Sequence, residues 1–314
     1  MNRVLIIDFS EYRDELVRIF SNMKCSVVLC DSAFDAMSKL KAYDFDLVVS
    51  QVELPGDNAF DLYNYISRNY PFIPAIMTTG RDIDTFFDRI FEEGIGNVIG
   101  MPPDEHEIRN LAQKLITREN IFGLKNYISG ITETKRISIT GSKQIQKAIH
   151  ALFETISSWG VEFRNKMALN LVLNEMIINA VYHSHGLTQE KEERKPVQLE
   201  KGQCVDLFFA RSEDKIGIAI DDYNGKLSSR KILDSINRAV EQENLIQEAF
   251  EKGEDVTDLV SETGRGIDLV RKLAGDYYFI IKEKFRTEIM LVFDIEAKQD
   301  ETDRKSSLKI IEDR

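Results

Sequence analysis

Residues 47–56 read LVVSQVELPG, an apolar run that ends in a Pro-Gly turn. A continuous apolar run of this length is typical of a strand that is buried on both faces, as in a parallel sheet. Further runs of this kind, spaced by helix-length segments, occur at residues 3–8, 25–30, 73–79 and 96–101. The alternation predicts an α/β fold, a doubly wound domain with a parallel five-stranded sheet, over residues 1–119.

The composition is typical of a globular protein with more than one core. A chain of 314 residues is long enough for two domains. No apolar run approaches the roughly 18 residues that span a bilayer, and the first residues lack the pattern of a signal peptide. We therefore expect a cytoplasmic protein without a membrane segment.

The net charge of -12 limits the classes of partner. Nucleic acid and anionic lipid both require a local excess of Lys and Arg, which an acidic chain disfavours. We therefore expect protein or nucleotide partners and no nucleic acid. Cys25, Cys30 and Cys204 are irregularly spaced, which indicates reduced core thiols rather than a disulfide framework or a zinc site.

The second half of the chain has a different pattern. Residues 120–136 are polar, contain glycine and are interpreted as a linker. Over residues 137–297, helix-like stretches and alternating strands predict an α+β sandwich, with a helix-rich block at about 228–263. The polar residues 184–203 indicate an exposed loop, and the charged residues 298–314 predict a disordered polar tail.

The ends of the first five runs are the places to look for a ligand site, because ligands meet the carboxyl ends of the strands in open α/β sheets. With VLIIDFS, DLVVSQVELPG and GMPPD in this order, residues 1–119 resemble a response-regulator receiver domain. The resemblance implies two acids that hold Mg²⁺, an Asp that accepts phosphate, a Thr or Ser that follows the phosphate and a Lys that pairs with it.

The sequence keeps Asp8 and Thr79 of that set and departs from it at three positions. Phe9 replaces the second acid, Gln51 the acceptor and Met101 the lysine. An amide cannot form an acyl phosphate, and most of the oxygen ligands that Mg²⁺ requires are gone. The sequence therefore predicts a receiver scaffold without its phosphorylation chemistry.

Glu53 lies two residues beyond Gln51, so strand alternation predicts that it points with Gln51 rather than into its place. The domain is therefore expected to be a pseudo-receiver that serves as a homodimerisation or docking surface. Regulation by a noncanonical signal is the alternative.

Residues 163–184 form a helix-like stretch with a carboxylate and an amide on one side. Glu175 and Asn179, in LNEMIINAVYHS, are four residues apart and lie one above the other on an otherwise apolar helix. Such groups need partners if they are buried. Alone, they favour ordinary polar residues on a helix surface.

Two later stretches have the chemistry of nucleotide recognition. IAIDDYNGKL is an alternating strand that ends at Asp222, whose carboxylate can accept a hydrogen bond from an exocyclic amine, and at a turn with Asn224 and Gly225. In ETGRGIDLVRKLAGD, Gly264 and Gly266 open a helix whose free backbone N–H groups can bind phosphate. Each signal alone is also typical of an ordinary turn or cap.

Together and in this order, the three stretches resemble the N, G1 and G2 boxes of the GHKL-type (HATPase) ATP-binding fold, and in particular the anti-sigma-factor serine kinases. The resemblance covers residues 137 to about 296. It implies that Glu175 is the general base, Asn179 the Mg²⁺ ligand and Asp222 the acid that reads adenine. The other nucleotide-binding residues that it implies are Asn224, Gly225, Gly264, Arg265, Gly266 and Thr287.

The sequence also departs from this second family. Asn224 and Lys226 occupy the glycine positions of its D-x-G-x-G adenine loop, and the block at 228–263, interpreted as an ATP lid, is longer than these kinases carry. A histidine kinase would need a phosphorylatable histidine before the domain. His150 is the candidate there, but it lacks the H-E-x-x-x-P pattern.

The combined interpretation is a cytoplasmic signalling protein that binds Mg-ATP and phosphorylates Ser or Thr of an anti-sigma-antagonist-like partner. Glu175 would accept the hydroxyl proton while Asn179 holds Mg²⁺. The alternative is a switch that binds ATP and sequesters a partner such as a sigma factor without phosphoryl transfer. Retention of Glu175 favours the enzyme, and the altered adenine loop favours the switch.

Overall fold

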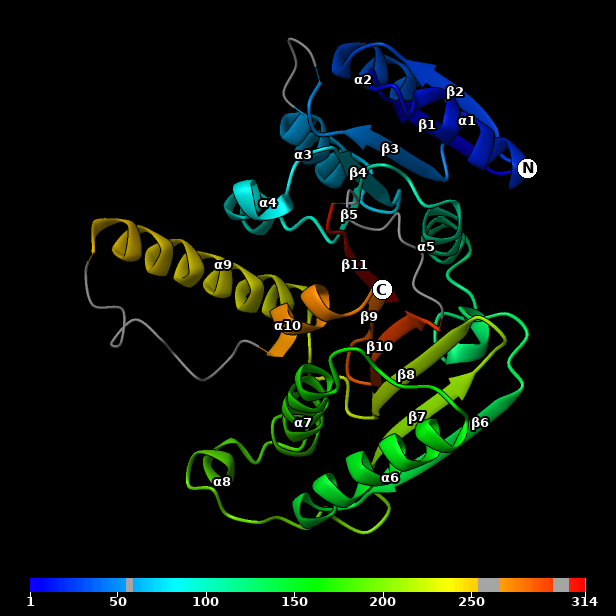
Figure 1. Cartoon of the computed structure of the whole chain (residues 1–314). Coiled ribbons are helices and arrows are strands. Elements are labelled where there is room, and N and C mark those ends of the chain that lie inside the picture. The colour runs from blue at the N-terminus through cyan, green and yellow to red at the C-terminus, as the bar shows by residue number, and fades with distance from the viewer. Residues whose placement is uncertain (55–58, 254–265, 296–304, 314) are drawn as a thin grey trace. The chain divides into compact units, whose positions relative to one another are not determined.

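Figure 1 shows the fold of the chain, a computed structural model that describes residues 1–54, 59–253, 266–295 and 305–313. The chain divides into two units. Unit 1 comprises residues 1–121 and 298–311, and unit 2 comprises residues 122–297 and 312–314. Within the described residues, no helix is both long enough and apolar enough to cross a membrane.

Unit 1 is built on a parallel sheet with the strand order β2-β1-β3-β4-β5. The strands are β1 (Arg3–Ile7), β2 (Ser26–Cys30), β3 (Leu47–Gln51), β4 (Ala75–Thr79) and β5 (Asn97–Gly100). The central strands β1, β3 and β4 are buried along nearly their whole length, as in sheets covered on both faces. The predicted parallel five-stranded sheet is therefore confirmed.

Helices alternate with these strands. They are α1 (Arg13–Asn22), α2 (Ala33–Ala42), α3 (Ala59–Asn69), the 3-10 helix η1 (Ile83–Phe86), α4 (Phe87–Glu93) and α5 (Glu105–Thr117). Helix α1 packs beside α5, and α3 packs against both α2 and α4, so the helices form two groups. Side-chain caps define two of the starts: Ser32 accepts a hydrogen bond at the start of α2, and Asp104 at the start of α5.

The end of the chain corrects the expectation of a disordered tail. Strand β11 (Leu308–Asp313) runs antiparallel to β5. Leu308 and Ile310 are buried, and the ammonium of Lys309 pairs with Glu107 of α5. The charged composition predicted a solvated segment, but its few apolar residues and its buried lysine find partners in unit 1.

Unit 2 contains an antiparallel sheet with the strand order β9-β10-β8-β7-β6. The strands are β6 (Glu133–Ile139), β7 (Val205–Arg211), β8 (Lys215–Asp222), β9 (Asp276–Lys282) and β10 (Arg286–Asp294). Strand β6 begins inside the stretch interpreted as a linker. Its first residues are polar and exposed, but they pair with β7.

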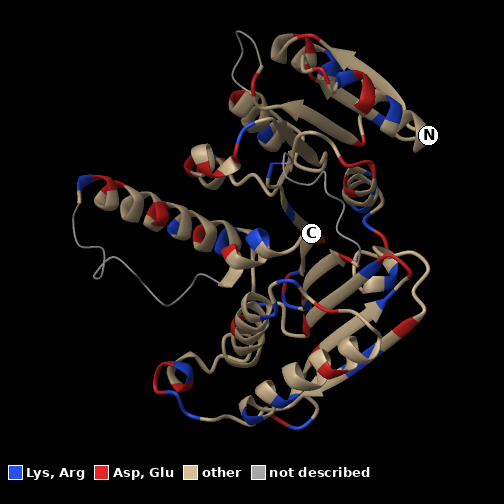
Figure 2. Ribbon diagram, in the orientation of Figure 1, with Lys and Arg blue, Asp and Glu red and all other residues tan. Residues whose placement is uncertain are grey.

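The helices of unit 2 are η2 (Leu124–Asn126), η3 (Ser142–Gln144), α6 (Ile145–Ser158), α7 (Lys166–Tyr182), α8 (Thr188–Glu192), α9 (Ser229–Lys252) and α10 (Gly266–Leu273). Helices α6 and α7 pack on each other and on the sheet, while α10 packs against α7 and α9. Figure 2 shows acidic and basic residues spread along α9, which occupies most of the described part of the expected lid.

Two expected loops carry structure. In the stretch interpreted as a linker, Leu124 and Ile128 are buried and lie against Gly217 of β8. In the loop expected at 184–203, residues Thr188–Glu192 form α8, and Leu199 is buried. Both segments are mostly polar, so their few apolar contacts are not visible as a periodic pattern.

Candidate functional site

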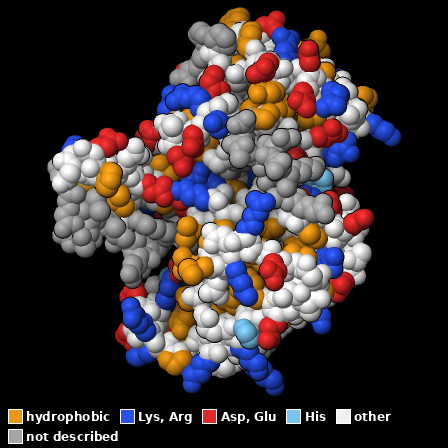
Figure 3. Space-filling view, viewed as in Figure 1, with side chains coloured by type: hydrophobic (Ala, Val, Ile, Leu, Met, Phe, Trp, Pro, Cys, Tyr) orange, Lys and Arg blue, Asp and Glu red, His pale blue; other side chains and the backbone are white. Residues whose placement is uncertain are grey.

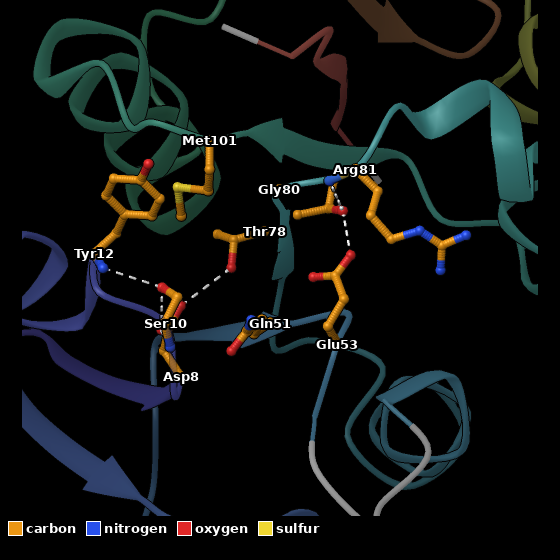
Figure 4. A pocket seen from close by; sticks show the side chains of 10 residues that line it. Asp8, Ser10, Tyr12, Gln51, Glu53, Thr78, Gly80, Arg81 and Met101 are labelled. Carbon is orange, nitrogen blue, oxygen red and sulfur yellow. Dashed lines mark hydrogen bonds between the residues drawn. The ribbon is translucent and has the colours of Figure 1, made fainter. Parts of the chain in front are cut away.

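A cavity of about 190 Å³ lies at the carboxyl ends of the strands of unit 1 (Figure 4). Its lining consists of Asp8, Ser10, Tyr12, Gln51, Glu53, Thr78, Thr79, Gly80, Arg81 and Met101. The lining side chains follow or end β1, β3, β4 and β5, which is where ligands meet open α/β sheets. The fold thus brings together the receiver-type positions that were singled out in the sequence, except Phe9, which is 43% exposed.

Hydrogen bonds within unit 1 hold Asp8 and Gln51. The buried Asp8 carboxylate accepts hydrogen bonds from the backbone N–H and the hydroxyl of Ser10, at 2.7 and 2.6 Å. Gln51 Oε1 accepts a hydrogen bond from the backbone N–H of Phe9 at 3.0 Å. The amide therefore orders the loop after β1, and it offers no carboxylate that could accept a phosphoryl group.

Glu53 makes a contact that the sequence analysis missed. Its Oε1 accepts a hydrogen bond from the Thr79 hydroxyl at 2.6 Å, and Thr79 Oγ1 in turn accepts one from the backbone N–H of Arg81 at 3.0 Å. Glu53 and Gln51 both line the cavity, as strand alternation predicts. The contact follows from the parallel pairing of β3 and β4, because residues just beyond the carboxyl ends of neighbouring strands meet.

The lining of the cavity offers carboxylates but no lysine. Met101, the residue at the position expected for the lysine, is buried. Arg81 lines the cavity, but its guanidinium lies over the Phe86 ring, 5.5 Å from the centroid, and points away from Asp8 in Figure 4. The cavity therefore lacks the lysine that pairs with phosphate in the receiver pattern.

In unit 2, helix α7 carries Glu175 and Asn179 one turn apart. The ammonium of Lys191 on α8 donates a hydrogen bond to Asn179 Oδ1 at 2.8 Å and lies 3.8 Å from Glu175 Oε1. It also lies 3.2 Å from His183 Nε2. Burial, reinforced by the Lys191 charge, lowers the pKa of His183 and favours the neutral ring. The predicted base and the predicted metal ligand thus share a neighbouring cation, Lys191, which the sequence analysis placed in an exposed loop.

Asp222 is buried at the end of β8. Its Oδ2 accepts a hydrogen bond from the Ser184 hydroxyl at 2.7 Å, and its Oδ1 accepts one from the backbone N–H of Asn224 at 2.8 Å. Ser184 lies two residues after the end of α7, so this bond links the end of α7 to the end of β8. Gly225 has a φ of 56°, and a Cβ there would lie 2.6 Å from backbone atoms of the β9–β10 turn, so this position requires glycine.

Thr287 lies opposite Asp222 in the antiparallel pairing of β10 with β8. It is buried, and its hydroxyl has no hydrogen-bond partner among the described residues. A buried polar group left without a partner costs roughly 1 to 3 kcal/mol. A ligand that supplied the partner would therefore bind favourably beside the Asp222 carboxylate.

Gly266 begins α10 against the polar side of α7. A Cβ at this position would clash with Cγ of Glu175 and Cε of Met176, so the close approach of the helices requires glycine. The start of α10 thus lies beside the predicted base. Gly264 and Arg265, the other predicted residues of this phosphate loop, lie outside the described residues.

The donor set on α7 is compatible with magnesium bound together with a nucleotide. Mg²⁺ in such sites takes one or two protein ligands and completes its shell with phosphate oxygens and water. The amide oxygen of Asn179 can be such a ligand. Among the residues that the structure describes, no three His, Cys, Asp or Glu side chains are arranged to hold a metal ion on their own.

The comparisons with known proteins concern unit 1. Residues 4–113 match the family model described as "Response regulator receiver domain". The curated protein "Two-component response regulator-like PRR1" of Oryza sativa subsp. japonica is 26% identical over 134 residues, which are 40% of this chain and 26% of that protein. The chain thus spans about a quarter of that relative's length.

Solved structures similar to this chain are also receivers. The chemotaxis response regulator CheY4 of Vibrio cholerae is 19% identical, with a TM-score of 0.34 and coverage of 37% of this chain and 98% of that one. The non-phosphorylated HemR receiver domain from Leptospira biflexa is 24% identical, with a TM-score of 0.34 and coverage of 37% and 95%.

Residues 4–113 are therefore a response regulator receiver domain, and unit 1 has the expected α/β fold with five parallel strands. This class of domain implies a role in signal transduction. The family match ends at residue 113, so the function of unit 2 must be argued from its own geometry.

Proposed function

We propose that unit 2 is a GHKL-type ATP-binding domain and that the chain transfers phosphate from Mg-ATP to a Ser or Thr of a partner protein, as anti-sigma-factor kinases do. The receiver domain would be its regulatory or dimerisation module. The observation that carries the proposal is that Thr287, whose buried hydroxyl has no hydrogen-bond partner in the part of the chain that the structure describes, lies opposite the buried Asp222 on the neighbouring strand. A flat ring with an exocyclic amine and ring nitrogens would satisfy both groups.

Each residue has a distinct part in the proposed reaction. Asp222 accepts a hydrogen bond from the adenine amine, and Asn179 provides an oxygen for Mg²⁺, which neutralises phosphate charge when bound. Glu175, beside the start of α10, accepts the proton of the partner's hydroxyl. Backbone N–H groups at the start of α10 are suited to phosphate, because a helix N-terminus leaves them unpaired.

A non-catalytic switch is the second candidate. Asn224 and Lys226 occupy the positions where the adenine loop of the resembled family has glycines. This altered loop favours a protein that binds nucleotide without turnover. Such a protein would bind ATP and sequester a partner without phosphoryl transfer.

The proposed partner is a protein, anti-sigma-antagonist-like or sigma-factor-like, and the proposed location is the cytoplasm. We propose no nucleic-acid or membrane partner. On the face shown in Figure 3, the described Lys and Arg side chains lie among acidic and apolar ones, whereas binding to phosphate backbones requires a continuous basic surface.

Asp222→Asn tests the nucleotide site. The variant should bind ATP about ten to a hundred times more weakly in calorimetry, because a hydrogen bond to a charged group contributes roughly 1.5 to 3 kcal/mol. The affinity for GTP should fall less, since guanine lacks the amine at this position. Asp294→Asn is the matched control, because Asp294 pairs with Lys215 at the other end of β10 and β8. Equal losses for both nucleotides would argue against Asp222 as the adenine reader, and a wild-type chain that binds no nucleotide would overturn the proposal.

A further inference from the structure

Three side chains form a polar row along α7 that ends beside α8. Glu175, Asn179 and His183 are spaced by four residues, so they lie on one side of the helix. Lys191 contacts all three, at 3.8, 2.8 and 3.2 Å. Its ammonium therefore contacts both residues that the proposed function assigns to metal binding and proton transfer, Asn179 and Glu175, as well as His183.

The position of Lys191 is fixed by further contacts between α8 and the end of α7. The backbone N–H of Leu187 donates to the carbonyl of Tyr182 at 2.8 Å. The hydroxyl of Thr188 lies 3.1 Å from His183 Nδ1. The Lys191 side chain is 28% exposed, so its ammonium can leave Asn179 for solvent without unfolding the helix.

We propose that Lys191 determines how much Mg²⁺ unit 2 needs in order to bind ATP, because its ammonium occupies the oxygen of Asn179 that the metal requires. Lysine and metal then exclude each other, and the nucleotide-bound form is reached only when Mg²⁺ displaces Lys191. This inference rests on the proposed function.

Two physical effects enforce the exclusion. The Asn179 oxygen that accepts the ammonium hydrogen bond faces the same space that a metal ligand must face, and Mg²⁺ demands near-ideal geometry at about 2.1 Å. A divalent cation and an ammonium a few Å apart also repel each other, and a partly exposed site does not fully screen this repulsion.

A phosphate-binding role for Lys191 is less consistent with its contacts. Within the described residues, the ammonium contacts Glu175, Asn179 and His183, and the proposed function needs the first two of these side chains free. A second lysine also lies near this end of α7, because burial and the charges of Lys191 and Lys231 lower the pKa of His183. Lys191 is therefore not the only cation near the site that could neutralise phosphate.

The test is a Mg²⁺ titration of ATP binding by calorimetry, with EDTA as the metal-free reference. Wild type is compared with Lys191→Met, Lys191→Arg and Lys195→Met. Lys191→Met should bind ATP at about one tenth of the Mg²⁺ concentration that wild type needs, as expected for the loss of a hydrogen bond from a charged group. Its affinity for ATP in EDTA should not rise.

The two other variants are controls. Lys191→Arg keeps the cation and should resemble wild type, which a merely structural role of the lysine stem would not predict. Lys195 lies in the same segment, but its side chain pairs with Glu193 and is 64% exposed, so Lys195→Met should also resemble wild type. The fluorescence of Trp159 in unit 2 reports whether each variant is folded.

The outcomes separate this inference from the proposed function. Weaker ATP binding by Lys191→Met at every Mg²⁺ concentration would mean that Lys191 binds phosphate, and an unchanged Mg²⁺ midpoint would mean that it does not compete. Either result overturns the inference, but the proposed function of unit 2 as an ATP-binding domain would stand. If none of the four proteins binds ATP, the proposed function falls and the inference with it.

Discussion

At the scale of single residues, Glu175 and Asn179 lie one turn apart on α7 but offer different chemistry. An amide oxygen can bind a hard cation but cannot take a proton from serine, whereas a carboxylate can do so. Substitution of each residue should therefore impair a different step, binding for Asn179 and phosphoryl transfer for Glu175. The difference separates an enzyme from a switch.

Asn179→Ala should lose Mg-ATP binding, while Glu175→Gln should bind Mg-ATP and transfer phosphate about a hundred to ten thousand times more slowly, the usual range for a lost general base. Binding is measured by calorimetry and transfer by labelled phosphate on the partner. Asn174→Ala, one position before Glu175 and hydrogen-bonded to Gln146, is the control. If wild type binds a partner in the presence of ATP without transfer, and Glu175→Gln leaves that binding unchanged, the kinase proposal fails and the switch stands.

Glu288 and Asp221 are fully buried carboxyl groups that lie opposite each other on β10 and β8. Arg286 pairs with both, at 3.1 and 2.6 Å. Burial, followed by the charge of Asp221, raises the pKa of Glu288 well above its ordinary value of 4.5. The folded chain therefore favours the protonated carboxyl group of Glu288. Its contribution to the free energy of unfolding is complete below the pKa that Glu288 has in the unfolded chain, and it is lost as the pH rises through the pKa in the folded chain.

Glu288→Gln should remove this loss of stability. The amide keeps an acceptor for the Gly123 N–H, so the free energy of unfolding of the variant, relative to that of wild type, should increase as the pH rises above the pKa of glutamate in the unfolded chain. Urea unfolding followed by Trp159 fluorescence measures unit 2 alone. The exposed Glu283→Gln is the control. A pH-independent difference would show that Glu288 is ionised in the folded chain.

At the scale of elements, the carboxyl end of β3 determines what the receiver domain can do. Gln51 offers no carboxylate, and Glu53 is engaged by Thr79. We expect no phosphorylation of unit 1 by acetyl phosphate with Mg²⁺, as measured by intact mass. Gln51→Asp is the informative companion, because it restores the acceptor without the lysine and should gain at most a short-lived adduct. A stable, Mg²⁺-dependent mass increase within residues 1–119 of wild type would contradict the expectation.

The strands could be predicted from the sequence where burial leaves a local pattern. The runs of unit 1 and the alternating strands at residues 205–222 and 276–294 show it, because most of their residues face a core. Strand β11 and helix α8 could not be predicted, since both are short and rich in charged residues and are held by tertiary contacts, β11 with β5 and α8 with the end of α7. The sequence predicted which residues form the candidate site but not all of their contacts. The position of Thr287 opposite Asp222 depends on the register of β10 against β8. The contact of Lys191 with Asn179 depends on how a polar segment folds against α7.

At the scale of the whole molecule, the stability of the receiver domain depends on the far end of the chain. Leu308 of β11 is fully buried opposite Val98 of β5. Leu308→Ala should lower the stability of unit 1 by about 2 to 4 kcal/mol, as buried Leu-to-Ala changes do. Labelling of the buried thiols Cys25 and Cys30 in urea reports this unit, whereas Trp159 fluorescence, a probe of unit 2, should change little.

The control for this prediction is Lys305→Ala, whose side chain is exposed just before β11. It should leave thiol labelling unchanged. Equal labelling of wild type and Leu308→Ala would show that β11 contributes nothing to unit 1.

The pairing of β5 with β11 also determines when the edge of β5 can be covered during synthesis of the chain. Gly100 and Ser307, which meet through a hydrogen bond, are 207 residues apart. At about 5 to 20 residues per second, the ribosome needs on the order of 10 to 40 s to make the chain between them. Throughout that interval β5 is an open strand edge, the feature that invites pairing with another nascent chain. Most of unit 1 is therefore translated before unit 2 but can be completed only after it, and its dependence on chaperones should be greatest while unit 2 is being made.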